Sequence, residues 1–404
     1  HADKRNSYTL VLANPPFNVD DVNLGKVEQD KRFNTYGIPR NKSKTKKKGE
    51  ETCPNGNYLW INLFATSLKE DGRAALVMAN SASDARHSEA NIRKSLIENN
   101  LIYGMLTLPS NMFYTVTLPA TLWFFDKAKT DDRILFIDAK NIFTPIDRAH
   151  REFSEEQVQN IAVISRLHKD NRESYVELVH SYFQNGFSRL KVYGSSLKDV
   201  SKKVTGFLAE YKVKNIPNFS PVIDSAKTLL EGFQKYDKNY SADNIDKSNK
   251  EQVKLALNVK PFFEALHQLL KTVDKEVRHI EKDNSGSKDI KALKTELEEL
   301  HREVKETEYF FAHINWLQDR FPDARYDDVT GLCKLATIDE IKEQDYSLNP
   351  GRYVGVVIEE DGKTEEEFIE EMLSMNDELT KLNADAQKLE STITHNIKQI
   401  AGEE

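Results

Sequence analysis

The residues with the clearest chemical potential are Asn14-Pro15-Pro16-Phe17, close to the start of the chain. Asn14 and Pro15 each precede a proline, which favours extended backbone geometry. Proline also fixes φ and lacks an N–H donor. The predicted result is a stiff loop with two acceptors, the Asn14 side-chain oxygen and the Pro15 carbonyl, beside the Phe17 ring. The competing interpretation is a rigid turn with no further role.

Two acceptors beside an aromatic ring suit the exocyclic amine of adenine. The lone pair of that nitrogen is delocalised into the ring, so the amine is a poor nucleophile. Acceptors on both of its hydrogens favour a more tetrahedral nitrogen, which can attack an electrophilic methyl group. The nitrogen is unreachable inside a duplex, so the base must be flipped out. Stacking on an aromatic ring would contribute about 1–3 kcal/mol to holding it.

The segments around this loop predict an α/β sheet. Strand and helix alternate, which is typical of a mixed, mainly parallel sheet with crossover helices. The last two strands follow in quick succession and predict an antiparallel edge. Short apolar runs and helical apolar spacing predict strands at 8–13, 73–79, 101–108, 119–126 and 133–138, and helices at 57–70 and 88–99. The loop 14–17 then lies at the carboxyl end of a strand, where open α/β sheets bind ligands.

Beyond about residue 150 the sequence is charged and helical. Two apolar seams at three-four spacing flank the breaker cluster 283–287, and they predict an antiparallel helical hairpin at about 251–316. A third seam, from Phe368 to Ile400, predicts a long coiled-coil-like helix that needs a facing helix in this chain or in a partner. The predicted regions are an α/β part at 1–150, a helical insertion at 151–336 and a helical tail for partner docking at 337–404.

Several segments resemble the methylation (modification) subunit of type I restriction–modification systems. The resemblance covers residues 8–150 and 337–400, whereas residues 151–330 are interpreted from periodicity alone. The matching segments are Leu12 to Asn18, Asn57 to Trp60, Gly72 to Val77, Leu108 to Tyr114 and Tyr346 to Tyr353.

The resemblance implies S-adenosylmethionine-dependent methylation of adenine N6 in DNA. It implies a cytoplasmic complex of two such subunits with a DNA-reading specificity subunit, joined by an endonuclease subunit when the system restricts DNA. By motif match, Asn14 and Pro15 would bind the target amine, and Phe17 would stack on the base. Phe113 would be a second base-stacking residue, with Tyr114 as the alternative, and ordinary core packing is the competing interpretation for this pair.

One departure from the family concerns the cofactor. The glycine-rich S-adenosylmethionine loop that the family places before the catalytic strand is not found, and the sequence contains no Gly-x-Gly. Only seven residues precede the first predicted strand, and residue 1 is His1, so we expect a chain that begins mid-protein. We therefore expect this chain alone to bind S-adenosylmethionine weakly or not at all.

A basic segment follows the catalytic loop. Residues 40–48 carry six positive charges in nine positions, and Lys46, Lys47 and Lys48 are predicted to contact DNA phosphates. A solvated loop is the alternative. The whole chain has a formal charge of −8, so a DNA-binding partner would supply much of the phosphate contact.

Other features exclude whole classes of protein. Cys53 and Cys333 lack metal-ligand spacing, so reduced thiols and no metal site are expected. No apolar run is long enough to span a bilayer, and a cytoplasmic location is expected. Two alternative functions stay open. Protein glutamine methyltransferases use a similar loop but usually end it with tyrosine, and Phe17 argues against them. A catalytically incomplete scaffold would explain the helices but not the loop.

Overall fold

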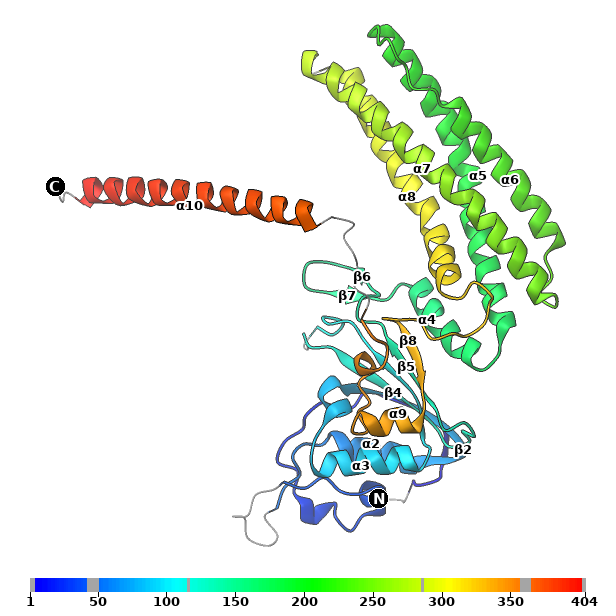
Figure 1. The fold of residues 1–404 in the computed structure, drawn as a ribbon, viewed down its shortest axis with the longest axis vertical. Helices are drawn as coiled ribbons and strands as arrows, with labels where there is room; N and C mark the ends of the chain where they lie inside the picture. Colours follow the sequence, from blue (N-terminus) through cyan, green and yellow to red (C-terminus); the bar gives the residue numbers. More distant parts are fainter. Residues whose placement is uncertain (1–3, 42–50, 115–116, 285–286, 357–364, 402–404) are drawn as a thin grey trace. The chain divides into compact units, whose positions relative to one another are not determined.

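The computed structural model describes residues 4–41, 51–114, 117–284, 287–356 and 365–401. The chain divides into two compact units, His1–Gly355 and Val356–Glu404. The first unit contains a β-sheet and a bundle of long helices, and the second contains the helix α10 (Figure 1).

The sheet of the first unit has six strands in the order β1-β2-β4-β3-β5-β8. Their bounds are β1 Tyr8–Ala13, β2 Leu68–Ala79, β3 Ile102–Thr107, β4 Ala120–Asp126, β5 Ile134–Asp138 and β8 Cys333–Ala336. Four strands, β1, β2, β3 and β5, run in one direction, whereas β4 and β8 are antiparallel to their neighbours. The predicted mixed, mainly parallel sheet is confirmed. An antiparallel edge strand is present, but it is β8. The two strands from which the edge was predicted, β4 and β5, do not pair with each other, because β4 lies inside the sheet between β2 and β3.

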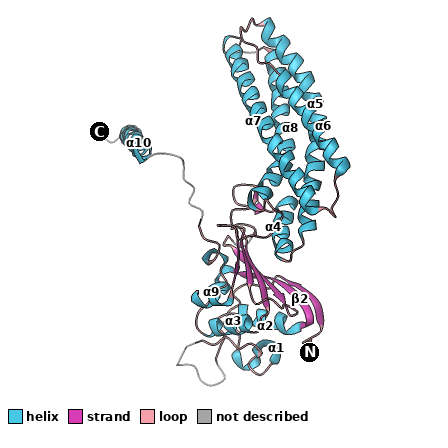
Figure 2. Cartoon of the chain, turned by 45° about the vertical axis from the view of Figure 1, so that its right-hand side comes forward, coloured by secondary structure: helices cyan, strands magenta, loops and turns pink. Residues whose placement is uncertain are grey.

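Three helices cover one face of the sheet: α2 (Asn57–Ser67), α3 (Ser88–Glu98) and α9 (Ile338–Glu343) (Figure 2). Tyr58 of α2 and Trp123 of β4 are both fully buried there, with ring centroids 6.2 Å apart. The prediction that the helix beginning at residue 57 extends to residue 70 is wrong, because α2 ends at Ser67. Leu68 is fully buried in extended geometry and pairs with Tyr8 of β1, so the strand begins where helical spacing alone would continue the helix.

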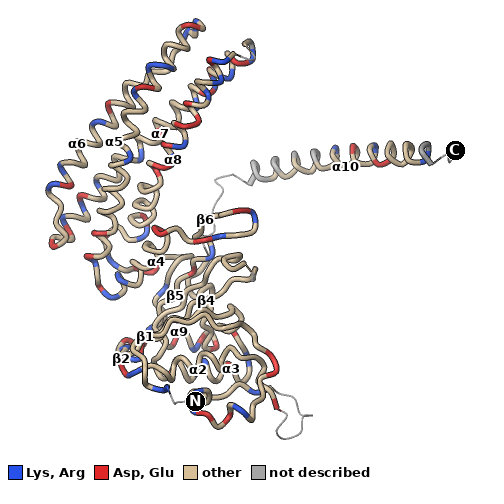
Figure 3. The backbone as a smooth tube through the Cα atoms, turned by 180° about the vertical axis from the view of Figure 1, so that it is seen from behind, with Lys and Arg blue, Asp and Glu red and all other residues tan. Residues whose placement is uncertain are grey.

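The opposite face of the sheet packs against α4 (Glu155–His168). The core continues from there into a bundle of four long helices, α5 (Arg172–Glu210), α6 (Ser220–Asn239), α7 (Ile245–Asp283) and α8 (Lys288–Arg320). The region predicted as a helical hairpin is occupied by α7 and α8, which contact each other and also α5. Lys and Arg are interspersed with Asp and Glu along the bundle helices, as expected for solvated faces (Figure 3).

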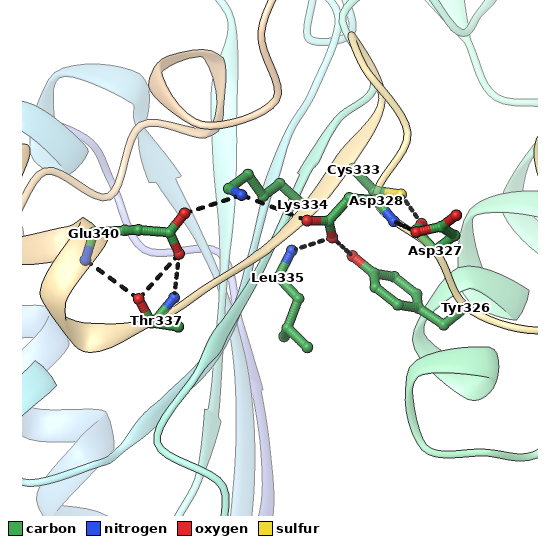
Figure 4. Close-up of polar contacts among 8 residues, drawn as sticks. All are labelled: Tyr326, Asp327, Asp328, Cys333, Lys334, Leu335, Thr337 and Glu340. Atoms are coloured by element: carbon green, nitrogen blue, oxygen red, sulfur yellow. Dashed lines mark hydrogen bonds and ion pairs between the residues drawn. The ribbon is translucent and has the colours of Figure 1, made fainter.

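The strand β8 re-enters the sheet after the bundle. Cys333 pairs with Ile137 of β5, so the chain leaves and rejoins the sheet at neighbouring strands. Asp328 accepts a hydrogen bond from the Leu335 backbone N–H at 2.9 Å, while Lys334 bridges Asp328 and Glu340 at 3.5 and 3.0 Å (Figure 4). These contacts occupy the outer side of the edge strand and connect it to α9, whose first turn carries Glu340.

The second unit is the single helix α10 (Glu365–Ala401). Large apolar side chains along the described part of this helix are at least half exposed. These are Ile369, Met372, Leu373, Met375, Leu379, Leu382, Leu389, Ile393 and Ile397. The predicted coiled-coil-like helix is present. None of the helices in the described ranges is both long and apolar enough to cross a membrane.

Candidate active site

The carboxyl ends of β1, β2, β3 and β5 meet at one edge of the sheet, because these strands run in the same direction. Asn14 follows directly on Ala13, which lies level with Leu76 of β2. The loops after the other three strands therefore rise from the same edge as the Asn14–Phe17 loop. This is the position at which open α/β sheets bind ligands.

The loop 14–17 is anchored through its neighbour Asn18. The side chains of Asn18 and Asn57 are joined by a hydrogen bond of 2.8 Å from Asn57 Nδ2, and Asn57 Oδ1 accepts from the Asn18 backbone N–H at 2.9 Å. Asn57 is buried at the start of α2. Within the loop, Pro15 is buried and Asn14 is exposed. The amide of Asn14 is therefore available to a ligand on a loop that α2 holds in place.

Asn57 anchors the residue that follows the loop, and the sequence analysis assigned it no role. It belongs to a segment that was matched to the family as a whole, without a role for each member. A buried asparagine at a helix start requires a polar partner. That requirement is the one signal from which its role could have been inferred.

Phe17 and Phe113 lie together, although 95 residues separate them in the sequence. Their rings meet edge to face, with centroids 6.5 Å apart and an interplanar angle of 84°. Both are partly buried against the larger core. The structure thus brings Phe113, which was predicted as the second base-stacking residue, next to the loop 14–17. Tyr114 is 86% exposed and instead contacts the ring of His150, at 4.7 Å.

The segment Tyr346–Tyr353 closes over the loop that follows β2. Asp84 accepts hydrogen bonds from Ser347 Oγ and from Asn349 Nδ2, the latter at 3.1 Å, and lies 3.4 Å from the Arg352 guanidinium. Burial opposes ionisation of Asp84, but these bonds and the Arg352 charge outweigh it and lower its pKa. Tyr353 stacks on Phe136 with centroids 3.9 Å apart. The segment therefore fixes the edge of the sheet next to the candidate site.

Lys46, Lys47 and Lys48 lie outside the described residues. Burial raises the pKa of Cys53 to about 11 and that of Cys333 to about 12, which favours the neutral thiol in both. In the described ranges, no three His, Cys, Asp or Glu side chains are grouped so as to hold a metal ion.

The described residues at this edge include no Gly-x-Gly loop of the kind that the family resemblance implies for S-adenosylmethionine. Two carboxylates near this edge have partners within the chain: Asp84 lies in the turn after β2, and Asp138 ends β5. Asp84 is bound as above, and Asp138 pairs with Lys140 at 3.0 Å. The proline loop offers few N–H donors. The groups described at this site are thus the acceptors of Asn14 and Pro15 and the Phe17 ring.

A mixed α/β sheet with an Asn-Pro-Pro-Phe loop at its carboxyl edge is the arrangement of an amino-group methyltransferase. The chain matches the N-6 DNA Methylase family over residues 1–181 and 269–362, and it belongs to this family.

Within this family, the chain is similar to methylase subunits of type I restriction enzymes. The chain is 36% identical over 178 residues to the type I restriction enzyme MjaIX methylase subunit of Methanocaldococcus jannaschii, covering 43% of this chain and 31% of that protein. It is 32% identical over 164 residues to the HindI methylase subunit of Haemophilus influenzae, covering 40% and 34%. The chain thus spans about a third of the length of these relatives.

Among solved structures, the type I restriction–modification methyltransferase subunit from Streptococcus thermophilus is similar, with a TM-score of 0.33 and 23% identity. The matched region covers 39% of this chain and 31% of the Streptococcus thermophilus chain.

Proposed function

We propose that this chain supplies the target-base side of an adenine-N6 DNA methyltransferase, within the modification subunit of a type I restriction–modification complex. The observation that supports this most directly is the contact between Phe17 and Phe113 beside the Asn14–Pro15 acceptors. Membership of the N-6 DNA Methylase family and the similarity to type I methylase subunits agree with it.

The proposed chemistry uses the chain's own acceptors. A flipped adenine enters the space beside Phe17, and its amine donates one hydrogen to the Asn14 side-chain oxygen and the other to the Pro15 carbonyl. Both acceptors then favour a tetrahedral nitrogen whose lone pair is available for attack on a methyl group. Pro16 and the Asn18–Asn57 hydrogen bonds keep the loop rigid, so little reorganisation is needed when the base arrives.

The methyl donor is proposed to be S-adenosylmethionine, held mainly by residues outside this chain. We accordingly expect isothermal titration of this chain with S-adenosylmethionine to show no binding in the micromolar range. A micromolar dissociation constant would contradict that expectation and would require a cofactor site among these residues.

The proposed partners are DNA, a specificity subunit, a second copy of the modification subunit and an endonuclease subunit, in a cytoplasmic complex. The exposed seam of α10 is the surface proposed to dock the specificity subunit, because an isolated helix with so narrow an apolar face needs a facing helix. Lys46, Lys47 and Lys48 are proposed to contact DNA phosphates. Deletion of residues 364–404 should abolish co-purification with the specificity subunit.

The test of the central proposal is Asn14→Ala in the assembled complex, with transfer of labelled methyl groups to DNA as the measurement. The expected loss is at least about 100-fold in turnover, since one preorganised transition-state contact is removed. The matched control is Asn239→Ala, an exposed asparagine at the end of α6, which should methylate at the parental rate. Undiminished methylation by the Asn14 variant would overturn the proposal. Methyl transfer to a glutamine-containing peptide and none to DNA would replace the substrate.

A further inference from the structure

Two elements beside the candidate site are joined to each other. The loop between β3 and β4 follows the carboxyl end of β3, and the hairpin of β6 (Thr144–Pro145) and β7 (Arg151–Glu152) follows β5, the parallel neighbour of β3. The Arg151 backbone N–H donates to the Asn111 carbonyl at 3.0 Å. The Arg151 guanidinium donates to Ser110 Oγ at 3.2 Å. The hairpin is therefore held against the loop that carries Phe113.

The joined elements present an exposed surface of mixed apolar and basic character. Tyr114 is 86% exposed, Leu118 is 72% exposed and Ile146 is 55% exposed. We call the set Tyr114, Leu118, Ile146, Arg148 and His150 the loop–hairpin surface. Large apolar side chains exposed on two elements that are joined to each other favour a contact with another molecule.

The charged side chains of the hairpin differ in whether they have a partner among the described residues. Asp147 accepts from the backbone N–H groups of Ala149 and His150 and from the His150 ring, with distances of 2.6, 2.8 and 2.8 Å. Arg151 lies over the Phe143 ring at 4.0 Å. Arg148, at the bend, is exposed and makes no ion pair within the part of the chain that the structure describes. A guanidinium in this position can contact an anionic group of a ligand.

The position of the surface identifies the ligand. Phe113 packs against Phe17, and the next residue, Tyr114, belongs to the surface. DNA that placed a flipped base beside Phe17 would therefore pass close to the loop that carries Tyr114. An aromatic ring with an unpaired arginine is a combination that binds bases by stacking and phosphates by charge.

We infer that the loop–hairpin surface binds the DNA next to the flipped adenine, with Tyr114 stacking on a neighbouring base and Arg148 contacting a phosphate. The ring of His150, oriented by Asp147, supports the Tyr114 ring from behind as a positioning residue. This inference rests on the proposed function, and it adds residues of the hairpin β6–β7 to the DNA-binding surface.

The first experiment compares Arg148→Gln with Arg302→Gln in the assembled complex. Arg302 is an exposed arginine of α8 in the bundle and serves as the matched control. The measurement is the dissociation constant for a duplex containing the target site, over a series of salt concentrations. Arg148→Gln should weaken binding and reduce the slope of log K against log salt by about one. Arg302→Gln should leave both unchanged. Equal slopes for the two variants would overturn the phosphate contact.

The second experiment tests stacking with Tyr114→Ala and Tyr114→Phe. The probe is a duplex with 2-aminopurine at the target position, whose fluorescence rises when the base is flipped out. Tyr114→Ala should weaken binding of this duplex at least about fivefold, and Tyr114→Phe should restore it, since the ring is retained. If Tyr114→Phe binds as weakly as Tyr114→Ala, stacking is refuted. Urea denaturation of both variants checks that each is folded.

The outcomes separate this inference from the proposed function. If Asn14→Ala abolishes methylation while the Arg148 and Tyr114 variants bind DNA normally, only the loop–hairpin inference fails. If DNA binding depends on Arg148 and Tyr114 but methylation does not depend on Asn14, the proposed function fails and the DNA contact stands. Loss of another subunit from the complex on changing Tyr114 or Arg148 would overturn the inference and assign the surface to a protein partner.

Discussion

A methyl group added at Gly186 tests how closely α5 packs against α8. A Cβ atom there would lie 2.9 Å from Phe311 Cζ and 3.0 Å from Cε2. The Phe311 ring has little room to move, because it is surrounded by the rings of Phe183, Phe187 and Phe263, at 6.3, 5.2 and 5.5 Å between centroids. Gly186→Ala must therefore displace a ring inside a packed aromatic cluster.

The same substitution at Gly194, two turns further along α5, provides the reference. A Cβ at Gly194 meets nothing within 4 Å. Replacing a helical glycine by alanine stabilises a helix by about 1 kcal/mol, and this gain applies to both positions. Overpacking a core destabilises by about 1–3 kcal/mol, and it applies at Gly186 alone. Gly186→Ala should accordingly be less stable than Gly194→Ala by about 1–3 kcal/mol.

Urea denaturation followed by circular dichroism at 222 nm measures this difference, since the bundle contains most of the helix. Gly194→Ala should shift the midpoint to higher urea, and Gly186→Ala should fall below it. Introducing Phe311→Leu into both variants should reduce the gap, because the obstructing ring is gone. Equal midpoints for the two alanine variants would refute the close packing described here.

Three further predictions concern the sheet and the bundle. Tyr353→Phe removes the hydrogen bond from the Tyr353 hydroxyl to the Ser347 carbonyl but keeps the ring, so urea denaturation should show a loss of about 1 kcal/mol; no loss would mean that this bond contributes nothing. Asn57→Ala should destabilise by about 1–3 kcal/mol and slow methylation by the complex, whereas normal turnover would show that the loop needs no support. Burial lowers the pKa of His180 below its ordinary 6.5, so the unfolded chain binds the proton more readily, and stability should decline as the pH falls below 6.5. His180→Phe should flatten that decline. An unaltered dependence of the free energy of unfolding on pH would contradict this prediction.

The position of the candidate site could be predicted from the sequence because its determinants are local. Prolines restrict the backbone of their own residue and of the one before, so the loop at Asn14 was identifiable without knowing the fold. The strand before it and the helix after it follow from the spacing of apolar residues. The meeting of Phe17 with Phe113 required the family resemblance, since no local rule links residues so far apart.

Contacts between distant segments could not be predicted in this way. The strand β8 has only four residues, and apolar periodicity cannot distinguish so short a strand from a loop. The hydrogen bonds of Asp84 with Ser347 and Asn349 join residues more than 260 positions apart. Heptad seams showed which faces of the helices are apolar, but not that α5 and α6 would cover α7 and α8.

The pairing of Ile137 with Cys333 has a consequence for how this chain can vary. Residues facing each other on antiparallel strands lie about 4.5–5.5 Å apart, a gap that a two-residue turn can close. The residues between Ile137 and Cys333 therefore form an insertion between two strands that a short turn could join. The long bundle helices can lengthen, shorten or be exchanged without altering the register of any strand. The family match omits residues 182–268, and these residues lie wholly within this insertion.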